Sequence, residues 1–485
     1  MYSKIYKNIY LTFCLIGDID ERMTIDTQWL SCFKSECREA FTEKCRFKPT
    51  AVFSDGQIRL MQTGSSTLQT WDDYIYMRFV RYYAQFLKQA DTIIIAFDNY
   101  QYVPTAKCMT QSSRRKHVPV IPFNSQCPLP CMVPQGDQWM QHISNRTFKT
   151  RVIELVILRL PKLLLSKHPN KTIIIDYDTP VKYTAQVHEY NNKKTLEIQQ
   201  EALTDYPPLG EADVKFCRWC DEYRSVIVDS IDGDSVPIAL MHHETLLTRE
   251  QIPPRISIYR MYIRDENDEP PSLARATSKI DSTNKRKIET TEKQRQPRKY
   301  EYLDIYLLYQ SLIGCVRQTI GRLECLPSHR GHEIRMIISL ITLTGTDFTR
   351  HLPQVSGRSV WDMLVPIWMS LAMCYDPLQS QLKTQETPNV LITKIYHTKY
   401  HKHVQPANGM SYDATHHDLM HSTISQRTKD SLASPERIAT TVKNCNWVLQ
   451  YWMCTNTPPD PISQQFGYSK NTNNQVNYED LIHCM

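Results

Sequence analysis

The stretch DTIIIAFDN, residues 91–99, decides the fold that this sequence is expected to adopt. Its run of β-branched residues predicts a buried strand, and Asp98 follows directly after the run. An earlier stretch, TAVFSDG at residues 50–56, ends in the same way at Asp55. The segment between the two, residues 71–90, has the apolar face of a helix. We therefore expect a strand, a helix and a second strand in this part of the chain.

The same alternation follows twice more. Residues 148–165, FKTRVIELVILRLPKLLL, are expected to form a helix that Pro161 ends or kinks, and KTIIIDYD at residues 171–178 is expected to form a strand. A helix that begins at GEAD, residues 210–213, then precedes the strand expected in SVIVDSIDGD, residues 225–234. Alternating strands and helices predict an α/β fold with a mostly parallel sheet that helices cover on both faces.

The composition narrows the class of protein. Lys and Arg number 57 and Asp and Glu 51, and the resulting net charge of +6 permits a polyanionic partner without requiring one. The 15 cysteines form no regular framework, which favours reduced thiols in the nucleus or cytoplasm, with Cys217 and Cys220 as buried thiols. No apolar run reaches the roughly 18 residues of a membrane span, so no membrane segment is expected.

Shifts in composition divide the chain into regions. The core contains a proline-rich polar insertion at about residues 100–145, and the C-terminal region is polar and partly helical. In that region Ser434 is placed to cap a helix whose apolar stripe is expected to pack in a core, at Ile438, Val442, Cys445, Leu449 and Trp452. The regions are an N-terminal segment (1–50), the core (51–264), a charged linker (265–299), a helical part that completes the core (300–376) and the C-terminal region (377–485).

Acidic residues follow the apolar runs. Because the carboxyl ends of parallel strands meet at one edge of a sheet, acids at those ends are expected to converge there. Two more acids stand in GEAD at the start of a helix and can join them. Alternatively, each acid caps a helix or a turn on its own account. The candidate ligands are Asp55, Asp98, Glu211, Asp213, Asp232, Asp234 and Asp347.

Such a group of carboxylates predicts bound cations. Acids that share a cleft repel one another unless cations neutralise them. A set of oxygen ligands without His or Cys favours Mg²⁺ or Mn²⁺ over zinc. Two such ions together can activate a water molecule and stabilise the leaving oxygen of a phosphodiester. The acids therefore predict a two-ion site for phosphodiester hydrolysis.

The order of these motifs resembles that of the XPG/flap endonuclease family, whose members are PIN-like, metal-dependent nucleases. The motifs are FSDG, AFDN, GEAD, DGDS and TGTDF, and the resemblance spans about residues 50–365. It implies a PIN-like three-layer fold with a central mostly parallel sheet, a helical extension and a polar C-terminal region. It also implies that the seven acids hold two Mg²⁺ or Mn²⁺ ions and that the protein cleaves branched, flapped or single-stranded DNA.

Basic residues complete the resemblance. Lys107 and Arg114 would share a face if their segment is helical, and they are similar to the basic pair of the family that contacts the scissile phosphate. An ordinary solvated basic loop is the alternative. Further contacts with nucleic acid are expected from the neighbouring basic residues and from two arginines after the last acidic motif, namely Arg115, Lys116, Arg350 and Arg358.

The sequence also departs from the family pattern. Gln354 and Ser356 stand where the family carries the glycines of a helix-turn-helix that grips duplex DNA. An RNA endonuclease with the same two-ion site is therefore one alternative. A non-catalytic protein that binds nucleic acid or acts as a scaffold is another, although relatives of that kind commonly lose the acids. Protein partners are expected to bind through the C-terminal region.

Overall fold

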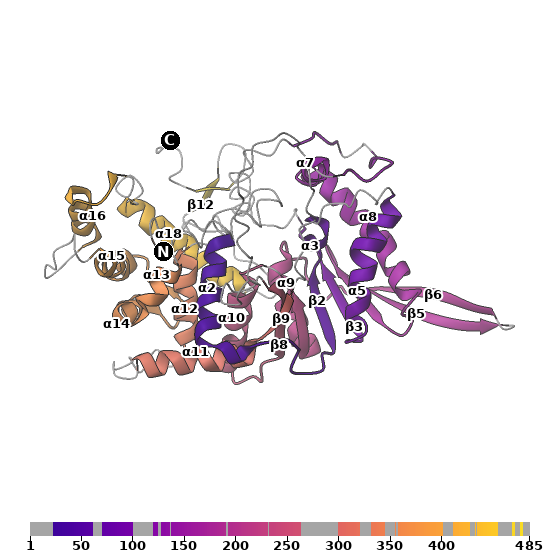
Figure 1. Ribbon diagram of the computed structural model, residues 1–485, viewed down its shortest axis with the longest axis horizontal. Helices are drawn as coiled ribbons and strands as arrows, with labels where there is room; N and C mark the ends of the chain where they lie inside the picture. The colour runs from indigo at the N-terminus through magenta and orange to yellow at the C-terminus, as the bar shows by residue number, and fades with distance from the viewer. Residues whose placement is uncertain are drawn as a thin grey trace, which may run out of the picture.

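A mixed sheet forms the centre of the structure, a computed structural model (Figure 1). In the described part of the chain its nine strands follow the order β1-β9-β8-β7-β2-β3-β4-β5-β6. The five central strands are parallel: β8 (Arg255–Tyr262), β7 (Ser225–Asp229), β2 (Ala51–Asp55), β3 (Thr92–Ala96) and β4 (Thr172–Asp176). The strands at both ends are antiparallel: β1 (Phe41–Thr42), β9 (Lys299–Asp304), β5 (Val181–Tyr190) and β6 (Lys193–Ala202). The expected α/β class with a mostly parallel sheet is confirmed.

The structure describes residues 23–61, 70–99, 120–124, 128–135, 137–190, 193–230, 232–262, 299–320, 331–344, 355, 357–400, 411–426, 432, 434–453, 468–470 and 476–478. Several expected features lie outside these ranges, including most of the polar insertion and residues 265–298 of the charged linker. The expected site residues outside them are Lys107, Arg114, Arg115, Lys116, Asp347 and Arg350.

The sheet separates two hydrophobic cores. Side chains of a strand point alternately to its two faces, so Ile93 and Ile95 of β3 join one core and Ile94 joins the other. The first core is covered by α4 (Trp71–Ile75), the π-helical segment η4 (Tyr76–Val80), α5 (Arg81–Phe86), α7 (Asp137–Ile143) and α8 (Arg146–Leu165). The second is covered by α2 (Met23–Glu36), α9 (Ala212–Tyr223), α10 (Ser235–Thr248) and α11 (Ile305–Ile320). Both faces are therefore shielded by helices, as the sequence predicted.

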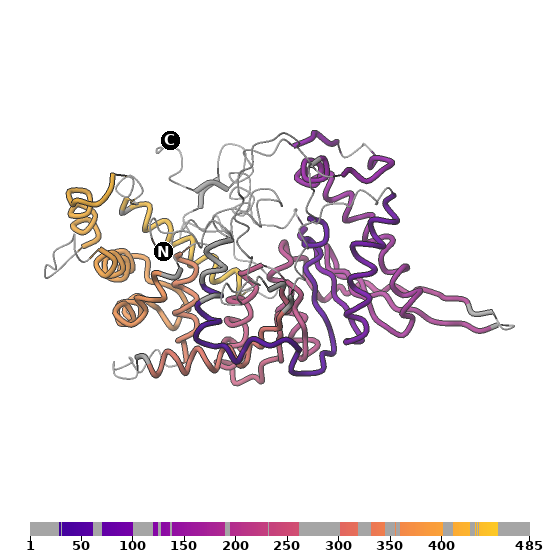
Figure 2. Tube along the Cα trace, in the orientation of Figure 1, coloured from indigo at the N-terminus to yellow at the C-terminus, as the bar shows by residue number. Residues whose placement is uncertain are grey.

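A helical body extends the second core away from the sheet (Figure 1). It includes α12 (Glu333–Thr344), α13 (Gly357–Asp362), α14 (Leu364–Cys374), η6 (Pro388–Ile392), α15 (Thr393–Lys399) and α16 (Tyr412–His421). In Figure 2 helix α2 lies beside this body, and it contacts α11 and α13. None of the described helices has both the length and the apolar character needed to cross a membrane.

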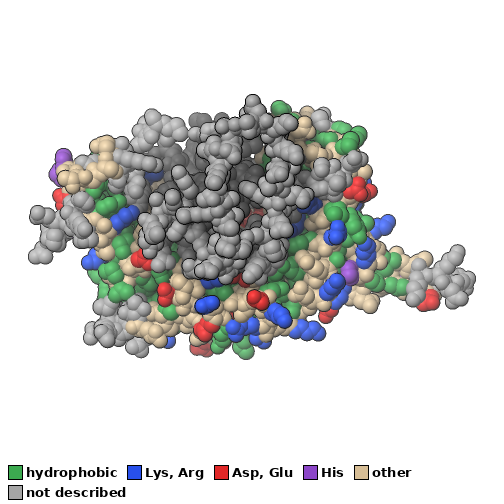
Figure 3. Space-filling model, in the orientation of Figure 1, with side chains coloured by type: hydrophobic (Ala, Val, Ile, Leu, Met, Phe, Trp, Pro, Cys, Tyr) green, Lys and Arg blue, Asp and Glu red, His purple; other side chains and the backbone are tan. Residues whose placement is uncertain are grey.

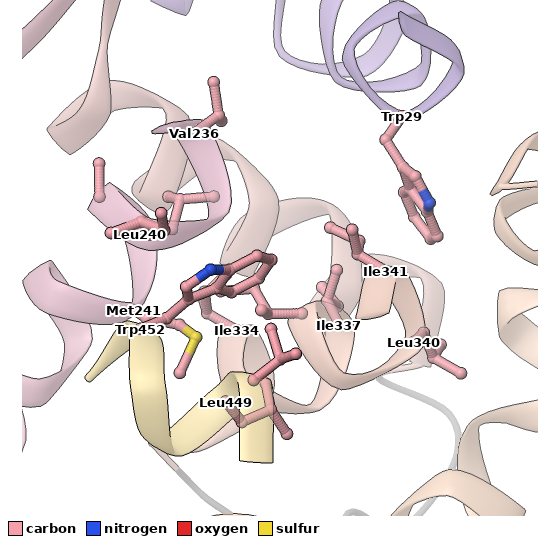
Figure 4. Close-up of a cluster of buried hydrophobic side chains, with 14 of the residues drawn as sticks. Trp29, Val236, Leu240, Met241, Ile334, Ile337, Leu340, Ile341, Leu449 and Trp452 are labelled. Carbon is pink, nitrogen blue, oxygen red and sulfur yellow. The ribbon is translucent and has the colours of Figure 1, made fainter. Parts of the chain in front are cut away.

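The C-terminal helix α18 (Pro435–Trp452) belongs to the same core. Ser434 caps it by accepting a hydrogen bond from the backbone N–H of Arg437. The whole apolar stripe expected from the sequence is buried. In Figure 4, Leu449 and Trp452 lie against Ile334 of α12 and Met241 of α10. The expectation that this stripe packs in a core is confirmed.

One expected boundary was wrong. Residues from Tyr300 onward were expected to be helical, but Lys299–Asp304 form β9 and α11 begins only at Ile305. In β9, Tyr302 lies beside Tyr259 of β8 with ring centroids 4.9 Å apart, so pairing with a distant strand outweighs the local pattern. Of the two effects expected of Pro161, ending the helix is excluded, because α8 continues for four residues to Leu165 and those residues complete its buried face.

The long hairpin β5–β6 was not expected from the sequence. Its two strands pair over their whole length, whereas β4 pairs only with Val181–Tyr183 at the start of β5. The rest of the hairpin projects from the body of the molecule (Figures 1 and 2). Its strands have no apolar run that would predict them, because many of their residues are polar, among them the exposed pair His188 and Glu197 at 3.0 Å.

Candidate active site

The strands that precede three of the acidic motifs are neighbours in the sheet. β2 pairs with β3 on one side and with β7 on the other, and all three are parallel. In this register Asp55 pairs with Ala96, and Asp98 follows two residues later. The carboxyl ends of these strands therefore lie at the same edge of the sheet, as the sequence predicted.

A close approach joins the ends of β2 and β3. Asp55 accepts a 2.8 Å hydrogen bond from the backbone N–H of Gln57, which fixes its carboxylate at the start of α3 (Gly56–Met61). At Gly56, an added Cβ would lie only 2.4 Å from the Phe97 ring. Glycine therefore allows the turn after Asp55 to reach the residue that directly precedes Asp98.

The GEAD motif meets the end of β3. The backbone N–H of Ala212 donates a 3.1 Å hydrogen bond to Asp98 Oδ1, and the N–H of Asn99 donates a 2.7 Å bond to the carbonyl of Gly210. Glu211 is the N-cap residue of α9 and is buried, and Asp213 lies in the first turn of the helix. Since the N-terminus of a helix carries a partial positive charge, these acids occupy a position that favours carboxylates.

Asp232 and Asp234 lie in a tight turn between β7 and α10. The backbone N–H of Asp234 donates a 3.1 Å hydrogen bond to Asp232 Oδ1, and the Ser235 hydroxyl donates a 2.7 Å bond to the carbonyl of Asp232. Asp234 is the N-cap residue of α10 and is buried. The DGDS motif therefore holds both acids just beyond the end of β7, the strand that pairs with β2.

Two further acids end strands at this edge, and sequence reasoning passed over both. Asp176, the last residue of β4, is fully buried and receives hydrogen bonds from Arg218 at 2.6 Å and from Trp219 at 2.7 Å, with Lys215 Nζ at 3.3 Å. Burial alone raises the pKa of Asp176, but the two cations and the hydrogen bonds outweigh it and leave the pKa below its usual value. The chain neutralises this carboxylate itself.

Asp229, the last residue of β7, is held in a similar way. It accepts hydrogen bonds from the Ser54 hydroxyl at 2.6 Å and from the Tyr82 hydroxyl at 2.7 Å. A guanidinium nitrogen of Arg59 lies 4.0 Å from its carboxylate, and the same guanidinium stacks 3.4 Å from the centroid of the Tyr82 ring. Burial raises the pKa of Asp229 despite these partners. The sequence signal that could have identified Asp229 was its position at the end of the apolar run SVIVD.

The structure therefore brings the ends of β2, β3 and β7 and the start of α9 to one edge, with six of the seven expected acids among the described residues. All six side chains are carboxylates, the donor type that Mg²⁺ and Mn²⁺ prefer. Within the described ranges, no three His, Cys, Asp or Glu side chains stand close enough together to hold a metal ion. The predicted seventh ligand lies outside those ranges.

The face of the molecule in Figure 3 carries side chains of both charges. Among the described residues in Figure 3, Lys and Arg side chains are interspersed with Asp and Glu rather than gathered in one patch. Arg358, expected to contact nucleic acid, is the second residue of α13. The visible charge pattern on this face therefore does not mark a nucleic-acid interface by itself.

Comparison with known proteins assigns no family to this chain. No protein-family model matches it, and no curated protein matches its sequence. The resemblance to XPG/flap endonucleases therefore remains a prediction that rests on the acidic motifs and their order.

Proposed function

We propose that this protein is a divalent-metal-dependent nuclease that hydrolyses phosphodiester bonds in branched, flapped or single-stranded DNA. The observation that carries the proposal is the hydrogen bond between Asp98 and the backbone of Ala212, which joins acidic motifs 114 residues apart. Asp55 is the last residue of β2, which pairs with β3. The DGDS turn follows β7, which pairs with β2. Convergence of acids from separate segments on one edge supports a site for cations rather than a set of unrelated helix caps.

The donor chemistry is consistent with two Mg²⁺ or Mn²⁺ ions. When bound, such ions supply an activated water molecule and stabilise charge on the leaving oxygen. The starts of α9 and α10 orient the carboxylates, and Lys107 and Arg114 are proposed to hold the scissile phosphate. The residues that would hold the ions are Asp55, Asp98, Glu211, Asp213, Asp232, Asp234 and Asp347.

The proposal includes a PIN-like arrangement of the core. The parallel strands β7, β2 and β3 with helices on both faces support it. So does the order in which the acidic motifs occur along the chain. The antiparallel strands added at both ends of the sheet would then be extensions of that core.

A cleavage assay with matched variants tests this function. Labelled flap DNA, single-stranded DNA and RNA are incubated with Mg²⁺ or Mn²⁺ and either the wild-type protein or the double variant Asp232→Asn, Asp234→Asn. We expect the double variant to lose at least about a hundredfold in cleavage rate, since it weakens the proposed ion site. Asp221→Asn is the control because Asp221 lies near the opposite end of α9 from Asp213 and pairs with His242 at 2.9 Å.

The substrates separate the alternatives. Preferential cleavage of RNA would indicate an RNA endonuclease with the same site. Binding without cleavage of any substrate would indicate a non-catalytic protein and contradict the proposal. Equal cleavage by the wild type and the double variant would also contradict it, provided that circular dichroism shows both to be folded.

A further inference from the structure

Two cysteines from distant parts of the sequence meet at the end of the N-terminal helix. Cys37 directly follows α2, and Cys315 lies on α11. The Cys315 thiol lies near enough to Cys37 to raise its pKa, and Cys315 Sγ lies 3.9 Å from the carbonyl oxygen of Glu36, the residue next to Cys37. One helical turn earlier on α11, Ser311 donates a 2.6 Å hydrogen bond to Glu39. Contacts on both sides of Cys37 therefore hold it against α11.

The two thiols differ in exposure. Cys37 is only 1% exposed, and its backbone is fixed by hydrogen bonds to Phe33 and Ala40. Cys315 is partly exposed, so a reagent in solution can reach its sulfur. In contrast, Cys217 and Cys220 are both buried on one helix. Cys37 and Cys315 thus combine an accessible thiol with a buried one beside it.

We propose that Cys37 and Cys315 are an oxidisable thiol pair whose disulfide fastens α2 to α11. The oxidant we infer is a small disulfide such as oxidised glutathione. The thiolate of Cys315 attacks one sulfur of that disulfide and releases one glutathione thiolate. The thiolate of Cys37 then attacks Cys315 Sγ and releases the second. Two protein thiols are oxidised, one disulfide is reduced to two thiols, and the two protein protons pass to the released thiolates.

The order of attack follows from the surroundings of the two thiols. Burial, together with the nearby Cys315 thiol, raises the pKa of Cys37 well above its ordinary value, so its thiolate is scarce near neutral pH. The second step should therefore accelerate as pH rises. A mixed disulfide between Cys315 and glutathione is the expected intermediate.

The bond would restrain a helix that contacts several others. Trp29 of α2 donates a 2.9 Å hydrogen bond to the hydroxyl of Thr344, the last residue of α12. Trp29 and Phe33 also pack edge-on against Trp361 of α13, with ring centroids 5.7 and 5.6 Å apart. The disulfide would therefore tie α11 to the helix that contacts the ends of α12 and α13. It concerns thiols outside the proposed ion site and holds whatever the function of that site.

Peptide mapping tests the proposal on the full chain. The wild type and the variants Cys37→Ser, Cys315→Ser and Cys131→Ser are incubated with oxidised glutathione under native conditions, alkylated and digested without reduction. Cys131 is exposed and serves as the control cysteine. We expect a linked peptide of Cys37 and Cys315 in the wild type and in Cys131→Ser. Cys37→Ser should stop at a glutathione adduct on Cys315, and Cys315→Ser should leave Cys37 unmodified.

Thermal unfolding provides an independent measurement. Because the bond closes a very long loop, oxidation should raise the melting temperature of the wild type by at least about 2 °C, and a reductant should reverse the rise. Neither Ser variant of the pair should show the rise. Absence of the linked peptide from folded wild-type protein would overturn the proposal. So would modification of Cys37 in Cys315→Ser, because it would show that Cys37 reacts without its partner.

Discussion

Asp98 Oδ1 accepts a 3.1 Å hydrogen bond from the backbone N–H of Ala212, so the end of strand β3 supports the first turn of helix α9. The first N–H groups of a helix have no partner within the helix, and a side chain from elsewhere in the fold here supplies one. Asp98 therefore has a structural role in addition to the proposed role in binding ions.

Two substitutions of Asp98 separate these roles. Asp98→Ala removes the hydrogen-bond acceptor and should lower the free energy of unfolding by about 1 kcal/mol. Asp98→Asn retains an acceptor oxygen and should unfold at nearly the wild-type urea concentration. Both variants should lose the proposed nuclease activity. A large loss of stability in Asp98→Asn would show that the charge, and not the hydrogen bond, supports the helix.

Gly56 provides a test of how the ends of β2 and β3 fit together. In Gly56→Ala the new Cβ would lie 2.4 Å from the buried Phe97 ring, which must shift. We expect a cost of about 1–3 kcal/mol in urea unfolding, typical of an overpacked core. Gly56→Ala should cost less when it is added to Phe97→Leu than when it is added to the wild type, because the smaller side chain leaves room for the new Cβ. Strict additivity of the two single changes would show that the two positions do not interact.

The buried carboxylate of Asp176 is expected to be essential for stability. Asp176→Ala leaves Lys215 and Arg218 in a buried site without their carboxylate partner and should cost about 3–5 kcal/mol. Because the pKa of Asp176 is lowered in the fold, its contribution is present above its ordinary pKa of 3.8 and is lost as pH falls below that value. Asp178→Ala, at an exposed position nearby, is the control and should unfold like the wild type.

The sequence revealed those parts of the fold that depend on local pattern. The β-branched runs of β3 and β4 predicted parallel strands because such runs are buried on both faces of a parallel sheet. In contrast, β9 is a strand because it pairs with β8, from which residues 263–298 separate it in the sequence. The hairpin β5–β6 depends on cross-strand pairing in the same way. Non-local pairing of polar segments has no strong periodic signal in one sequence.

The candidate site shows the same limit. Asp55 and Asp98 were found because each follows an apolar run, but Asp176 and Asp229 carry the same signal. In the folded protein each acid of the second pair meets a cation supplied by another segment, Arg218 for Asp176 and Arg59 for Asp229. The spacing of residues along the chain does not show which cation a buried acid will meet. Only the folded arrangement assigns those two acids a role in stability.

The C-terminal helix should stabilise the whole helical body. Trp452 is 1% exposed and belongs to the core shared by α10, α12 and α18. Trp452→Ala should therefore cost about 3–5 kcal/mol in urea unfolding, as expected when a buried aromatic side chain leaves a cavity. Lys443→Ala, at a partly exposed position of the same helix, is the control. Similar unfolding curves for the two variants would mean that α18 is not part of the cooperative core.

Glu244 should make the stability of the protein depend on pH. Its side chain is fully buried, accepts hydrogen bonds from the backbone N–H groups of Ile334 and Arg335, and lies 3.3 Å from the Arg335 guanidinium. Burial is the largest influence and raises the pKa of Glu244 from 4.5 to about 8, although Arg335 and the two amides oppose the shift. The folded protein therefore binds this proton more tightly than the unfolded chain does.

The sign of the effect follows from that difference. The contribution of Glu244 to stability is complete below about pH 4.5 and is lost as pH rises through about 8. Urea unfolding at intervals from about pH 5 to about pH 8.5 should therefore show a steeper decline for the wild type than for Glu244→Gln, which cannot titrate. Taking the difference between the two proteins cancels groups that titrate in both, such as His243, whose pKa burial lowers to about 4. Parallel curves would mean that the Arg335 guanidinium and the amides of α12 keep Glu244 ionised throughout this range.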